Sequence, residues 1–110
     1  MASNVEHERH RRERGVILEL LVAAGTMVAT VTLWRMMDAR GFTVTQDGLR
    51  FHLENYLEPQ GYIAITRARD LPGWQDNRSV LPSEVMGAKI TPKGIQILNR
   101  STEDPEVVIA

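Results

Sequence analysis

The sequence contains no cysteine, and this absence removes several kinds of protein at once. A chain without thiols has no disulfide framework, no thiolate nucleophile and no zinc site built on sulfur. Such a composition fits a cytoplasmic protein. Imidazole chemistry is left to the chain's three histidines, which are His7, His10 and His52.

Excess charge of either sign is also lacking. Lysine and arginine number 13 and aspartate and glutamate number 14, which gives a net charge of -1. The whole molecule therefore exerts no general attraction on nucleic acid or anionic lipid, and any site for a polyanion has to be a local patch. At 110 residues the chain is long enough for one domain with its own core and too short for two.

Enzyme signatures are missing as well. The chain has no glycine-rich phosphate loop, and none of its serines stands in a nucleophile-elbow context. His7 and His10 are three residues apart and can share a helical face, but no spaced set of histidines and carboxylates completes a metal site. We therefore expect a protein that is not an enzyme and holds no metal or cofactor.

One long apolar run, "GVILELLVAAGTMVATVTLW" at residues 15–34, carries a single charge, on Glu19. About 20 apolar residues are enough to cross a bilayer. However, Glu19 would cost up to about 2.5–3.5 kcal/mol inside the membrane, and Gly25 interrupts the run. The residues before it mix three glutamates with four arginines, unlike a secretory leader. The run predicts two water-soluble helices joined at Gly25 and no membrane partner.

Apolar residues recur at helical spacing in three successive segments, which predicts three helices. The segments cover residues 16–24, 28–40 and 46–58. Glycines end the first two, and the third follows Thr45, a favoured N-cap, and stops at Pro59. A charged extension, residues 1–14, precedes them.

The second half of the chain differs in residue composition and is richer in β-branched and aromatic residues after Gly61. Residues 62–68, "YIAITRA", and 85–90, "VMGAKI", predict two paired strands, and the polar insert 69–84 between them carries turn signals. Pro92 at a first helical position predicts a short closing helix within residues 91–100. The acidic residues 101–110 are expected to form a flexible tail.

This order of elements is typical of a winged helix-turn-helix domain. The expected fold is therefore mostly α with a small β-hairpin wing over residues 15–100. It has a three-helix core, a two-stranded wing and a short C-terminal helix.

The motifs "ARGFTVTQDGLRFHLENYLEPQGYI" and "KITPKGIQIL" also carry a family resemblance. They resemble winged-helix regulators of the PadR, ArsR and MarR types, and are similar to the amino-terminal domain of the archaeal nitrogen-regulation repressor and to small winged-helix proteins of Mu-like phages. The resemblance spans residues 11–100. It implies a homodimeric transcriptional regulator that binds double-stranded DNA. Two features depart from the family pattern: residues 53–61 contain one residue more, and the wing insert is longer.

In such a fold the third helix lies in the major groove, with its amino end near base edges. On this helix the residues away from the leucine stripe are Thr45, Gln46, Arg50, Phe51 and Asn55. Gln46 and Asn55 can pair with adenine, and Arg50 can reach guanine or a phosphate. The alternative interpretation is that these are ordinary solvated side chains.

The third helix has too much negative charge to bind DNA alone, because Arg50 is opposed by three carboxylates between residues 45 and 58. We expect Arg67, Arg69 and Arg78 of the wing to supply phosphate contacts, with Arg67 and Arg69 on one strand face. Alternatively, these arginines only keep a sheet edge soluble. The rival function is a winged-helix protein-interaction module without DNA binding, docking a partner through the third helix or through the wing around Trp74.

Overall fold

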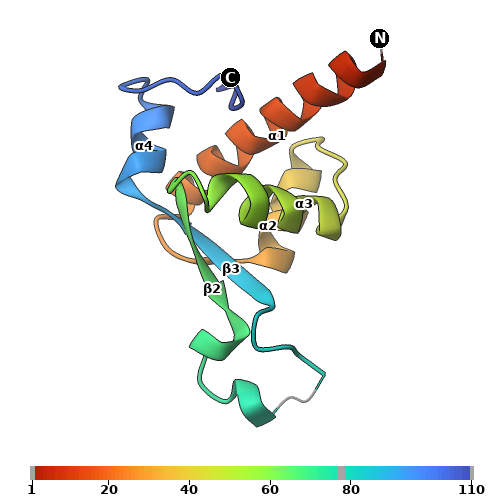
Figure 1. The fold of residues 1–110 in the computed structure, drawn as a ribbon, viewed down its shortest axis with the longest axis vertical. Coiled ribbons are helices and arrows are strands. Elements are labelled where there is room, and N and C mark those ends of the chain that lie inside the picture. The colour runs from red at the N-terminus through yellow and green to blue at the C-terminus, as the bar shows by residue number, and fades with distance from the viewer. Residues whose placement is uncertain (1, 77–78, 110) are drawn as a thin grey trace.

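The computed structural model describes residues 2–76 and 79–109, and these residues form four α-helices and a small three-stranded antiparallel sheet (Figure 1). In chain order the elements are α1 (Ala2–Ala24), β1 (Val28–Ala29), α2 (Thr30–Ala39), α3 (Gln46–His52), the π-helical turn η1 (Leu53–Leu57), β2 (Ile63–Arg67), the 3₁₀ turns η2 (Ala68–Asp70) and η3 (Trp74–Asp76), β3 (Val85–Ile90) and α4 (Pro92–Leu98).

The charged extension and the first predicted helix are one continuous helix, α1, of 23 residues. The helix ends at the predicted stop, where Gly25 has a φ of 69° that is unfavourable for residues with a side chain. The long apolar run is therefore divided between the end of α1 and α2. Among the described residues, no helix is both long and apolar enough to cross a membrane.

The sheet has one strand more than the sequence predicted. Strands β2 and β3 pair as expected, and the two-residue strand β1 pairs with the other side of β3, so that the order is β1-β3-β2. The predicted two-stranded wing is thus corrected to a three-stranded sheet. Two residues are too few to show an alternating pattern, so β1 had no signal in the sequence. Figure 1 shows β2 and β3 projecting away from the helices.

The third predicted helix begins where the sequence placed it. The Thr45 hydroxyl accepts a hydrogen bond from the Gly48 amide at 2.9 Å, as an N-cap does. The helix then widens into the π turn η1, in which the Glu58 amide donates to the Leu53 carbonyl at 2.9 Å. A π turn holds one more residue than an α turn.

The core lies between α1, the leucine stripe of α3 and η1, and the inner face of the sheet. Its fully buried large side chains are Ile17, Leu18, Leu21, Leu33, Met37, Leu49, Leu53 and Leu57. Burial of a leucine or isoleucine side chain is worth about 1.5–3 kcal/mol. Leu49, Leu53 and Leu57 recur every four residues in the sequence, and their complete burial confirms that they form the inner face of this segment.

The C-terminal segment packs on α1, in contrast to the flexible tail expected for residues 101–110. Val107 is buried, and the Val108 amide donates to the Arg11 carbonyl at 3.1 Å. Gly15 makes this approach possible, because a Cβ there would lie 1.8 Å from the Val108 carbonyl oxygen. Figure 1 shows the C-terminal segment crossing back toward α1.

Candidate functional site

Three of the predicted contact residues lie on α3 and the following turn η1 with at least part of the side chain exposed. Phe51 is 59% exposed, Asn55 is exposed and Gln46 is half-buried. Thr45 is exposed as well, but its hydroxyl is engaged in the N-cap hydrogen bond. Phe51 and Asn55, four residues apart, can share one helical face and leave a surface with apolar and hydrogen-bonding capacity for a partner.

Arg50 turns toward the sheet side of α3. Its guanidinium lies 3.4 Å from an Asp47 carboxylate oxygen, and the side chain is 32% exposed. It lines a cavity of about 270 Å³ together with Thr30, Val31 and Glu84. Its Nε is buried and has no hydrogen-bond partner within residues 2–76 and 79–109. Arg50 is therefore placed between α3 and the β1–α2 junction, partly screened by its own acidic neighbour.

Arg67 bridges β2 to the third helical segment. Its guanidinium donates to Glu54 and to Glu58, both at 3.0 Å, and to the Ser83 carbonyl at 3.0 Å. The side chain is only 20% exposed. The hydrogen bond that the guanidinium donates to Glu54 raises the pKa of Arg67, so the side chain stays charged. The positive charge of Arg67 is therefore matched within the molecule, in contrast to the free wing cation that the sequence predicted.

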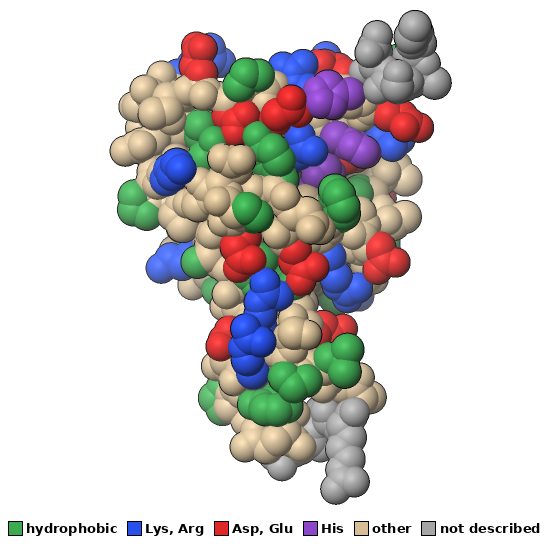
Figure 2. Space-filling view, in the orientation of Figure 1, with side chains coloured by type: hydrophobic (Ala, Val, Ile, Leu, Met, Phe, Trp, Pro, Cys, Tyr) green, Lys and Arg blue, Asp and Glu red, His purple; other side chains and the backbone are tan. Residues whose placement is uncertain are grey.

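Arg69 does not share a strand face with Arg67, and that expectation is corrected. A register shift interrupts the β2–β3 pairing at Arg67, the strand ends there, and Arg69 lies in η2 with an exposed side chain. Its amide donates to the Pro82 carbonyl at 3.0 Å. Arg78 lies outside the described residues. Figure 2 shows basic side chains directly below acidic ones where the helical body meets the projecting hairpin.

Apolar side chains gather on the β2–β3 connection, as Figure 2 also shows. Leu81 is 70% exposed, and Trp74 lines a cavity of about 180 Å³ with Leu71, Val80 and Met86. For Trp34 the sequence leaves open an interface or, as is commoner for tryptophan, the core. Trp34 packs against the core, and its indole N–H donates to the Val44 carbonyl at 2.6 Å.

Sequence reasoning missed a buried ionisable pair between α1 and α3. His52 Nε2 lies 2.9 Å from a Glu13 carboxylate oxygen, and both side chains are at most 4% exposed. From its place on the third helix near Glu54, His52 is predicted to face DNA or to lie at the boundary of the core, and its burial shows that this prediction is wrong. The signal was present in the helical spacing, because Glu13 precedes the buried Ile17 by four residues and shares its face. Among the described residues, no group of three or more histidines and carboxylates is placed to hold a metal ion.

The C-terminal segment contributes a second polar cluster. Asp104 accepts hydrogen bonds from the Tyr56 and Tyr62 hydroxyls at 2.7 and 2.6 Å. Burial and these bonds raise the pKa of Tyr62 to about 12 and raise that of Tyr56 further. Burial opposes the charged form of Asp104, but the two hydroxyls outweigh it and lower the pKa of the carboxyl.

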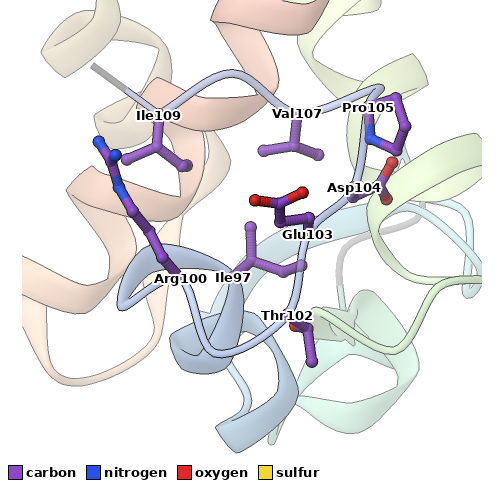
Figure 3. Close-up of a pocket in the computed structure, with 8 residues that line it drawn as sticks. All are labelled: Ile97, Arg100, Thr102, Glu103, Asp104, Pro105, Val107 and Ile109. Carbon is purple, nitrogen blue, oxygen red and sulfur yellow. The ribbon is translucent and has the colours of Figure 1, made fainter.

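A cavity of about 380 Å³ lies beside this cluster, under the loop that follows α4. Figure 3 shows Ile97 and Val107 on its apolar side and Glu103 pointing into it, with Arg100 at its edge.

No protein-family model matches the chain, and comparisons with curated proteins and with solved structures found no match either.

Proposed function

We propose that the chain is a winged helix-turn-helix domain that binds double-stranded DNA, as a small cytoplasmic transcriptional regulator and a homodimer. The observation that carries the proposal is the element order α1-β1-α2-α3-β2-β3 combined with the sheet order β1-β3-β2 and an exposed outer side of α3. In helix-turn-helix domains the second helix of the pair enters the major groove. Here that helix is α3, which follows α2 after a short turn.

Base contacts are assigned to three side chains. Gln46 and Asn55 are suited to the paired donor and acceptor of adenine, and Phe51 to the methyl group of thymine. The exposure of Phe51 on α3 and of Asn55 on η1 supports this role. Thr45 acts by capping the helix, since its hydroxyl is already occupied.

Phosphate contacts are assigned mainly to Arg69, because its side chain is exposed and no carboxylate contact is recorded for it among the described residues. Arg50 can add a contact where it emerges between α3 and the sheet. Arg67 has a positioning role: it neutralises Glu54 and Glu58 and ties the start of the wing to η1. Without it, two carboxylates would face the phosphate backbone.

The first experiment is a fluorescence-anisotropy titration with random duplex DNA at low and at moderate salt. We expect micromolar or tighter binding that weakens steeply as salt rises, because each neutralised phosphate releases counterions. Arg69→Ala should reduce the slope of log K against log salt by about 1. Arg100→Ala is the matched control, since this exposed arginine follows α4, away from the hairpin (Figures 1 and 3). Absence of binding at low salt would refute the proposal.

A protein-interaction module is the second candidate function. It is favoured by the acidic residues Asp47, Glu54 and Glu58 on the third helical segment and by the exposed Leu81 beside the Trp74 cavity. If DNA does not bind, Leu81→Asp becomes the informative variant. It should abolish binding to a purified partner while leaving the unfolding midpoint unchanged.

A further inference from the structure

The connection between β2 and β3 carries an exposed apolar residue, Leu81, whose side chain is 70% exposed. Val80, the residue before it, lines the cavity of about 180 Å³ beside Trp74, whereas Leu81 does not. Figure 2 shows apolar side chains on this projecting hairpin, below the basic ones. A large apolar side chain in such a place gains free energy when a partner removes it from water.

The backbone around Leu81 is firmly held. The carbonyl groups of residues 81–83 each accept a hydrogen bond at 3.0 Å, in turn from the Glu84 amide, the Arg69 amide and the Arg67 guanidinium. Pro82 directly follows Leu81 in this turn, and its ring fixes the backbone angle φ. The backbone that presents Leu81 is therefore ordered before a partner arrives, which reduces the entropy lost on binding.

The charge beside Leu81 indicates the class of partner. Arg69 is joined to Pro82 by a backbone hydrogen bond, its side chain is exposed, and no carboxylate among the described residues contacts it. Asp70 is engaged, because its carboxylate accepts from the Arg67 amide at 2.9 Å. An exposed cation next to an exposed leucine matches the phosphates and the stacked bases of DNA, which offer negative charge and apolar surface side by side.

We propose that Leu81 is a wedge that enters a base step from the minor groove and bends the duplex. This inference rests on the proposed DNA binding and adds a deformation of the DNA to it. Apolar side chains inserted in this way partly unstack the step and kink the duplex by about 20–90°. Arg69 then contacts a phosphate beside the opened step. Pyrimidine–purine steps such as TA are favoured, because they unstack most easily.

The test uses a duplex of about 25 base pairs with a central TA step, dyes for energy transfer at its two ends, and 2-aminopurine in place of the adenine at that step. Anisotropy first gives the protein concentration that saturates the duplex at low salt. At saturation, the unaltered chain should raise the energy transfer between the ends, because the duplex bends. It should also raise the fluorescence of 2-aminopurine, because the base unstacks.

Leu81→Ala should lose both signals at saturation, while the salt dependence of its binding stays unchanged, because leucine neutralises no phosphate. Leu81→Met keeps an apolar wedge and should retain both signals. Val22→Ala is the matched control, since Val22 is 39% exposed on α1 and lies outside the hairpin. All three changes are at exposed side chains, so the urea midpoint of each variant should equal that of the unaltered chain.

Each result separates the wedge from DNA binding itself. Equal bending by Leu81→Ala and the unaltered chain would overturn the wedge and leave Leu81 to a protein partner. A bound duplex that stays straight and stacked would also overturn it, while the DNA-binding proposal would stand. Absence of binding at low salt would refute both.

Discussion

At the scale of single residues, the observed surroundings of Arg67 differ most from those that its position in the sequence predicts. It is one of several arginines in a polar stretch, and nothing local distinguishes it from Arg69. Its partners Glu54 and Glu58 are thirteen and nine residues away in the chain, and only the packing of β2 beside η1 brings them within 3.0 Å.

Arg67→Ala should lower the free energy of unfolding by about 1–2 kcal/mol, since two partly screened ion pairs and one backbone contact are lost together. Urea unfolding of the variant measures this loss. Arg69→Ala is the control, and as an exposed substitution it should change stability by no more than about 0.5 kcal/mol. Equal stability of both variants would show that the bridge contributes nothing.

For the buried pair of Glu13 and His52, the sequence indicates the burial of one residue but not the identity of its partner. Glu13 stands in the charged run "HERHRRER" and looks like one more solvated residue. Its helical spacing from Ile17 placed it on the buried face, so the position was readable from the sequence. Its partner was not, because periodicity describes one helix and says nothing about which neighbour faces it.

At the scale of elements, the third helical segment and the C-terminal segment depend on each other. Tyr56 lies on η1 and Tyr62 directly precedes β2, and both donate to Asp104 of the C-terminal segment. Arg14 of α1 stacks on the Tyr56 ring at 4.2 Å and donates to Glu106. One carboxylate and one arginine thus join four segments that are far apart in the chain.

This cluster makes stability depend on pH at both ends of the range. The folded pKa of Asp104 is lowered, so its contribution is present above the unfolded value near 4 and is lost as the pH falls further. The pKa of Tyr62 is raised to about 12, so its contribution is present below pH 10 and is lost as the pH rises from 10 toward 12.

Asp104→Asn should lower stability by about 1–2 kcal/mol at pH 7, because hydrogen bonds to a charged acceptor are replaced by neutral ones. The difference from the unaltered chain should shrink below pH 4, where Asp104 is itself protonated. Urea midpoints measured between pH 3 and pH 11 test this, and a difference that stays constant with pH would contradict the assignment. Glu103→Gln, at an exposed neighbouring residue, is the control.

At the scale of the whole molecule, fewer apolar residues are available for a dimer contact than the sequence predicts. The sequence predicts candidate dimer surfaces on the first helix and on the apolar segment with Ile95, Ile97 and Leu98. Ile97 is 4% exposed and belongs to the core, whereas Ile95 is 40% exposed and remains available.

We expect the chain to be a homodimer, and Ile95→Asp to shift it toward monomer by placing a charge in an apolar contact. Sedimentation velocity over a range of protein concentrations measures the shift. Val31→Asp is the control, since Val31 is 42% exposed on α2 and lies outside that surface. A monomer at every concentration would refute the dimer, and equal effects of both changes would refute this surface.

The sequence by itself determined the positions of the helices and of β2 and β3, because capping residues, glycines and apolar periodicity act over a few neighbouring residues. It also identified the amide and phenylalanine side chains that α3 exposes. Only the tertiary structure decided that β1 joins the sheet, that Arg67 is bound by two glutamates, that Glu13 meets His52 and that the acidic tail closes on two tyrosines. Each of these contacts pairs residues distant in the chain, and the choice of partner depends on how the helices and strands pack together, which local patterns do not encode.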